Sequence, residues 1–124
     1  MQKHTILLVE DNRDLRYSLR VILEKAGFAV LEAPNGVVAK AILQESAVDL
    51  VVTDVLMPGR DGLETITDLR QLNRRVPVIA MSGGGMAPAE FYLDLAAAFG
   101  AKALLNKPFS PEQLLGAIAS VLRG

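Results

Sequence analysis

The stretch VVTDVLMPGRDG (residues 51–62) decides how this chain folds. Two valines lead through Thr53 to a carboxylate, Asp54, and Met57-Pro58-Gly59 then interrupts any strand or helix. A buried apolar run that ends in a charged residue and turns at once is typical of a strand that carries a functional side chain to the edge of a sheet. We therefore expect Asp54 to close a buried strand.

Four further apolar runs resemble the one that contains Asp54. The five runs are residues 5–10, 28–33, 49–54, 77–82 and 102–107. Four of them are nearly continuous in apolar residues, which is typical of parallel strands covered on both faces. The run at 28–33 is more mixed and is expected at an edge of the sheet.

Segments with helical periodicity follow each of these runs: residues 13–27, 36–46, 62–73, 87–100 and 110–124. Ser110 is expected to cap the last of them, with Pro111 at its first helical position. We expect side chains that face the core to include Val37, Val38, Ile42, Phe91, Leu95 and Phe99. The fivefold alternation of strand and helix predicts a doubly wound α/β fold with a parallel sheet.

Composition narrows the class of protein. The 124 residues are 51% hydrophobic and carry a formal net charge of −1, which indicates a single domain with a substantial core. The nearly balanced charge argues against nucleic acid or an anionic membrane as a direct partner. The sequence contains no cysteine, which excludes disulfides, and no apolar run approaches the roughly 18 residues of a membrane span. We expect a cytoplasmic protein.

The residues that close the strands carry the chemistry. The first, third, fourth and fifth runs end in Glu10-Asp11, Asp54, Ser82 and Lys107, which a parallel sheet would bring to one edge. Three neighbouring carboxylates need a counter-charge, and a hard cation with oxygen ligands, Mg²⁺ above all, supplies it. Lys107 and Ser82 could hold an anionic oxygen. An anion beside a metal and a nucleophilic aspartate indicates phosphoryl transfer to Asp54.

Four motifs, in order along the chain, resemble the receiver domain of two-component response regulators, the CheY-like superfamily. They are LLVED (7–11), DVLMPGRDG (54–62), MSG (81–83) and NKPF (106–109). The resemblance implies a flavodoxin-like sheet of five parallel strands, in the order 2-1-3-4-5, flanked by five helices. It also implies that residues 1–124 form a single receiver domain, without an output domain.

The resemblance also implies roles for individual residues. Asp54 matches the phosphoacceptor, which attacks a phosphohistidine. Asp11 matches a direct Mg²⁺ ligand, Glu10 a residue that reaches the metal through water, and the backbone carbonyl of Leu56 a third protein ligand. The domain would then catalyse only its own phosphorylation and dephosphorylation.

Two further positions match the family and one departs from it. Ser82 and Lys107 match the hydroxyl and the lysine that contact the phosphoryl group, and the Lys107-Pro108 bond is expected to be cis. Leu104 stands where the family often has an aromatic switch residue, so an aromatic switch at that position is excluded.

The expected phosphodonor is a histidine kinase or a histidine phosphotransfer protein. The resemblance names no downstream target, and it allows a monomer or a weak homodimer, either free-standing or cut from a longer regulator. Two other functions stay open: a binding module that needs no phosphate, and a phosphohydrolase, which Leu56 disfavours because such enzymes commonly have a second acid at that position.

Simpler roles also stay open for some of these residues. Glu10 and Asp11 could act only as favourable charges at the start of the first helix. Arg13, Arg16 and Arg20 could form either a solvated face or a docking surface for the kinase.

Overall fold

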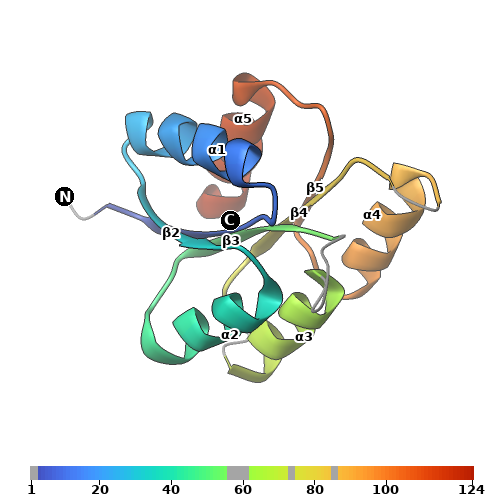
Figure 1. Ribbon diagram of the computed structural model, residues 1–124, viewed down its shortest axis with the longest axis horizontal. Coiled ribbons are helices and arrows are strands. Elements are labelled where there is room, and N and C mark those ends of the chain that lie inside the picture. The colour runs from blue at the N-terminus through green and yellow to red at the C-terminus, as the bar shows by residue number, and fades with distance from the viewer. Residues whose placement is uncertain (1–2, 56–61, 73–74, 85–86) are drawn as a thin grey trace.

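The computed structural model describes residues 3–55, 62–72, 75–84 and 87–124 (Figure 1). Within these residues the chain alternates regularly between strand and helix. The strands are β1 (Thr5–Val9), β2 (Ala29–Ala33), β3 (Leu50–Asp54), β4 (Val78–Ser82) and β5 (Ala103–Asn106). The helices are α1 (Arg13–Lys25), α2 (Gly36–Glu45), α3 (Gly62–Leu72), α4 (Ala89–Ala98) and α5 (Pro111–Arg123).

The five strands form one parallel sheet in the order β2-β1-β3-β4-β5. This arrangement confirms the doubly wound fold and places the mixed run, β2, at an edge as expected. Every residue of β3 and of β4 is buried, because helices cover both faces of the sheet. Among the described residues, no helix combines the length and the apolar character needed to cross a membrane.

The helices form two layers, one on each side of the sheet. Figure 1 shows α1 and α5 together on one face, and α2 and α3 on the other. Two apolar clusters fill these layers. One includes Leu19, Leu23, Leu114 and Ile118 from α1 and α5, and the other includes Ala39, Ile66, Leu69, Leu93 and Ala96 from α2, α3 and α4.

Local sequence signals account for the helix starts that frame the site. Asn12 caps α1 by accepting a hydrogen bond from the Leu15 amide at 2.9 Å. Ser110 caps α5 within a complete capping box, in which the Gln113 side chain also accepts from the Ser110 amide. The prediction of a Ser110 cap followed by Pro111 is therefore confirmed.

The predicted inward faces of α2 and α4 are partly wrong. Phe91 and Phe99 are 54% and 46% exposed, while Leu93 and Ala96 are the buried residues of α4. Apolar residues lie on most sides of this helix, so periodicity alone does not choose the face that packs against the sheet. In α2, Val37 and Val38 are likewise exposed, and Ala39 is buried with Ile42 beside it.

Candidate functional site

The carboxyl ends of the strands bring the predicted site residues to one edge of the sheet. Asp54 is the last residue of β3, and Glu10 and Asp11 follow directly after β1, its neighbour in the sheet. Ser82 ends β4 and pairs in register with Asn106 of β5, which Lys107 follows. Parallel pairing thus assembles residues that lie far apart in the sequence.

Three carboxylates form a tight acidic cluster. One oxygen each from Glu10, Asp11 and Asp54 lies within 4.8 Å of the other two. Glu10 is fully buried, Asp54 is 5% exposed, and Asp11 faces solvent. The cluster is therefore buried on its inner side and open on its outer side.

The ammonium group of Lys107 joins two of these carboxylates. Its Nζ lies 2.7 Å from Oε1 of Glu10 and 2.5 Å from Oδ2 of Asp54. Lys107 is placed by a backbone hydrogen bond from its amide to the Ser82 carbonyl, at 2.8 Å. The Lys107-Pro108 peptide bond is cis, as the resemblance implied.

Burial and neighbouring charges shift the pKa values of Glu10 and Lys107. Loss of solvent raises the pKa of Glu10 to about 7, against the lowering effect of hydrogen bonds from Lys107 and from the Asn12 amide. Burial also lowers the pKa of Lys107, but hydrogen bonds and charge interactions with Asp54 and Glu10 outweigh burial, so the net shift is upward. Lys107 is thus a firmly held cation among the carboxylates.

Ser82 is fully buried at the end of β4. Its Oγ accepts a hydrogen bond from the Gly84 amide at 3.1 Å, which fixes the hydroxyl within a tight turn. Gly84 has a φ of +86°, and a Cβ there would lie 3.3 Å from the Ala89 amide nitrogen at the start of α4. The backbone after Ser82 therefore requires glycine at position 84.

Of the two leucines singled out from the sequence, Leu104 falls within the described residues and Leu56 does not. Leu56, with its carbonyl, and the Met57-Pro58-Gly59 turn lie outside the described residues. Leu104 lies on β5 and is 39% exposed, so its aliphatic side chain is on the surface.

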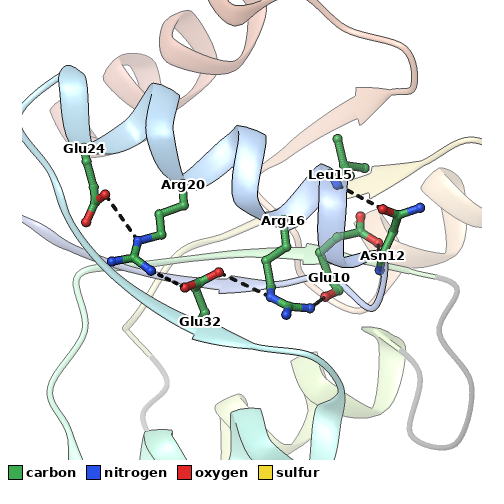
Figure 2. A network of polar contacts seen from close by, with 7 residues as sticks. All are labelled: Glu10, Asn12, Leu15, Arg16, Arg20, Glu24 and Glu32. Atoms are coloured by element: carbon green, nitrogen blue, oxygen red, sulfur yellow. Dashed lines mark hydrogen bonds and ion pairs between the residues drawn. The ribbon is translucent and has the colours of Figure 1, made fainter.

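Sequence reasoning missed the role of Asn12 at the site and misjudged Arg16. The Asn12 amide donates to Oε2 of Glu10 at 3.1 Å, and the Arg16 Nη1 donates to the Glu10 carbonyl at 2.8 Å (Figure 2). The Arg16 side chain is only 17% exposed, so the solvated face, one of the two interpretations left open for these arginines, does not describe this residue. The preference of asparagine for helix N-caps could have placed Asn12 at the start of α1, whereas no local signal reveals a contact made by a backbone amide or carbonyl.

Comparison with known proteins adds independent evidence. Residues 6–119 match the family described as the response regulator receiver domain. The chain is 35% identical to the chemotaxis protein CheY of Bacillus subtilis (strain 168) over 120 residues, which cover 96% of this chain and 98% of that protein. It is 40% identical to the transcriptional regulatory protein CpxR of Klebsiella pneumoniae over 118 residues, or 95% of this chain.

The chain spans about half the length of CpxR, 49%. Among solved structures, a putative response regulator from Chloroflexus aurantiacus J-10-fl superposes with a TM-score of 0.91 at 28% identity, over 99% of this chain and 100% of that chain. The fold, the ordered motifs and these matches agree, and this chain belongs to the family of response regulator receiver domains of two-component systems.

Proposed function

We propose that Asp54 is the phosphoacceptor of this receiver domain, and that a histidine kinase or a histidine phosphotransfer protein supplies the phosphoryl group. The observation that carries the proposal is the environment of the Asp54 carboxylate. It lies at a strand end, 2.5 Å from a lysine ammonium group and within an acidic cluster. Such a carboxylate is oriented and close to groups that can neutralise an incoming phosphoryl group.

The donor set fits Mg²⁺. The three carboxylate oxygens lie within 4.8 Å of one another. Mg²⁺ prefers oxygen ligands, and three carboxylate oxygens this close together could hold one ion, directly or through water. We assign Asp11 and Asp54 as direct ligands, Glu10 as a ligand through water, and the Leu56 carbonyl as the remaining protein ligand. When bound, the cation would neutralise negative charge on the transferring group.

The transfer step uses groups of this chain. A carboxylate oxygen of Asp54 attacks phosphorus, and the O–P bond forms as the N–P bond to the donor imidazole breaks. The imidazole nitrogen keeps the electron pair of that bond and takes a proton from solvent water. Lys107 pairs with a phosphoryl oxygen, and the Ser82 hydroxyl, released from the Gly84 amide, donates to another.

The wider setting belongs to the same proposal. The domain promotes only its own phosphorylation and dephosphorylation, in the cytoplasm where its donor would lie. It passes the signal to a protein target rather than to nucleic acid or a membrane, as a monomer or a weak homodimer. Residues 1–124 would serve as a single receiver unit, free-standing or within a longer regulator.

Phosphorylation by a small donor tests the proposal directly. The protein is incubated with acetyl phosphate, with and without Mg²⁺, and the mass of the intact protein is measured. We expect one added phosphoryl group that requires Mg²⁺ and is absent in Asp54→Asn. The control is Asp14→Asn, which removes an exposed carboxylate from the first turn of α1 and should leave labelling unchanged.

The opposite result would be equally informative. If the parent protein takes up no phosphoryl group and binds no beryllofluoride, Asp54 is not a phosphoacceptor. A binding module that needs no phosphate would then be the better description.

A further inference from the structure

The guanidinium group of Arg16 connects the acidic site to the edge of the sheet. Its Nη1 donates to the backbone carbonyl of Glu10 at 2.8 Å, and its Nε lies 3.3 Å from Oε1 of Glu32 on β2. Figure 2 shows the Arg16 side chain between these two acceptors. A planar guanidinium that satisfies two fixed acceptors has little freedom to turn.

The carbonyl that Arg16 holds belongs to the peptide unit between Glu10 and Asp11. Because a peptide unit is planar, the direction of the Glu10 carbonyl sets the position from which the Asp11 side chain starts. On the other side of Glu10, its amide donates to the Ala33 carbonyl at 3.1 Å. Hydrogen bonds therefore hold the backbone of Glu10 at both its amide and its carbonyl.

Further ion pairs beside α1 hold Glu32 in position. Oε2 of Glu32 accepts from Nη1 of Arg20 at 2.7 Å, and Nε of Arg20 lies 3.2 Å from Oε1 of Glu24. The four side chains form a row of alternating charge, from Glu24 near the end of the helix to Arg16 near its start (Figure 2). Glu32 is thus held between two arginines, which keeps it in position to orient Arg16.

We infer that Arg16, held by Glu32, is a positioning residue that orients the Glu10–Asp11 peptide so that both carboxylates face the metal site. The inference rests on the proposed Mg²⁺-dependent function of that site, and it assigns Arg16 no contact with the metal or the phosphoryl group. Partners that orient metal ligands typically change metal affinity when they are removed.

Mg²⁺ affinity of four variants tests the inference. Arg16→Met removes one charge together with the contacts to the Glu10 carbonyl and to Glu32. Arg16→Lys keeps the charge but loses the planar guanidinium group that makes both contacts. Glu32→Gln weakens the support of Arg16. Arg13→Met is the matched control, because Arg13 is an exposed arginine one turn earlier on the same helix and its loss changes the net charge equally.

We expect Arg16→Met to weaken Mg²⁺ binding roughly ten-fold, with Arg16→Lys and Glu32→Gln between it and the parent protein. The control should bind Mg²⁺ as the parent does. Saturating Mg²⁺ should restore the phosphorylation rate of Arg16→Met, because the defect lies in forming the site. A general loss of structure would not be rescued in this way.

A second readout needs no metal. In the metal-free protein, the order parameter of the Asp11 amide from ¹⁵N relaxation should fall in the Arg16 variants and stay unchanged in the control. If Arg16→Met does not fold, the same measurement on Arg16→Lys and Glu32→Gln decides the question.

Unchanged Mg²⁺ affinity and an unchanged Asp11 order parameter in the Arg16 variants would overturn the inference. So would tighter binding in Arg16→Met with parental binding in Arg16→Lys, since that pattern reports charge alone. A parent protein that binds no Mg²⁺ would contradict the proposed function instead, and the metal-free order parameter would still test the positioning role.

Discussion

The ammonium group of Lys107 lies 2.5 Å from a carboxylate oxygen of Asp54, although 53 positions separate the two residues in the sequence. The same ammonium group lies 2.7 Å from Glu10, so the two buried members of the acidic cluster share one cation. A cation in this position both stabilises the metal-free fold and competes with any metal for the same carboxylates.

Removal of the Lys107 charge should tighten Mg²⁺ binding. The ammonium group repels a cation held by the same carboxylates, and we expect its removal to tighten binding roughly ten-fold, which corresponds to about 1.4 kcal/mol. Lys107→Met should therefore bind Mg²⁺ more tightly while phosphorylation slows, because the cation that pairs with the phosphoryl group is lost. Mg²⁺ titration and phosphorylation rates check both effects.

Lys102→Met is the matched control for that experiment. Lys102 is exposed and precedes β5, whereas Lys107 follows it, so the control removes the same charge from the opposite end of the strand. Lys102→Met should alter neither the Mg²⁺ affinity nor the phosphorylation rate. Equal effects of the two variants on Mg²⁺ affinity would show that only net charge matters.

The metal-free protein should lose stability as the pH rises from about 4.5 to about 7. Burial raises the pKa of Glu10 from 4.5 to about 7, so between these values the folded state binds more protons than the unfolded state. The free energy of unfolding therefore decreases with rising pH, by at most about 3 kcal/mol from this group, and the loss is complete above pH 7. Thermal unfolding across this range, without Mg²⁺, measures the effect.

Two comparisons isolate Glu10 in that experiment. Glu10→Gln, which cannot ionise, should flatten the decline. Mg²⁺ should stabilise the parent protein more at neutral pH than at pH 5, where Glu10 is protonated. A parent and a glutamine variant with parallel pH profiles would contradict the assignment.

Arg70 should matter for stability but not for the site. Its two terminal nitrogens donate to the carbonyls of Val76 and Gly100, each at 2.9 Å, and so tie α3 to the segments that lead into β4 and β5. Arg70→Met should lower the free energy of unfolding by about 1–3 kcal/mol, because two charged hydrogen bonds are lost. Urea unfolding measures the change, and Mg²⁺ affinity should stay at the parental value.

The cap of α5 offers a smaller and cleaner test. Ser110→Ala removes the acceptor for the Gln113 amide at 3.0 Å and should cost about 1 kcal/mol in unfolding free energy. Ser120→Ala, at an exposed position within the same helix, is the control and should change stability little. Equal effects would mean that the cap does not stabilise the helix.

The periodicity of apolar residues, together with the residues that start and end helices and strands, was enough to predict most of the fold. Apolar runs gave the strands, the mixed run at 28–33 marked an edge, and Ser110 marked a helix start. The edge that holds the site followed as well, because parallel strands place their carboxyl ends together and because Glu10, Asp54 and Lys107 close their runs. These features depend on the order of residue types along the chain, which is local information.

Tertiary packing decided which face of a helix is buried and how burial shifts the pKa of a side chain. The inward face of α4, with Leu93 buried and Phe91 exposed, depends on which side meets the sheet, and a helix with apolar residues on most sides does not encode that choice. The pKa of Glu10 depends on its burial beneath neighbouring elements rather than on its residue type.

The contact between Arg16 and the Glu10 carbonyl shows most clearly what the local sequence predicts and what only tertiary packing decides. The sequence by itself determined that an acidic pair ends the first strand and that arginines follow on a helix. Only the folded chain decided that one arginine turns inward, because Glu32 arrives from the neighbouring edge strand to hold it. Contacts of this kind arise from elements that meet in space, and a backbone carbonyl leaves no residue-type signal in the sequence.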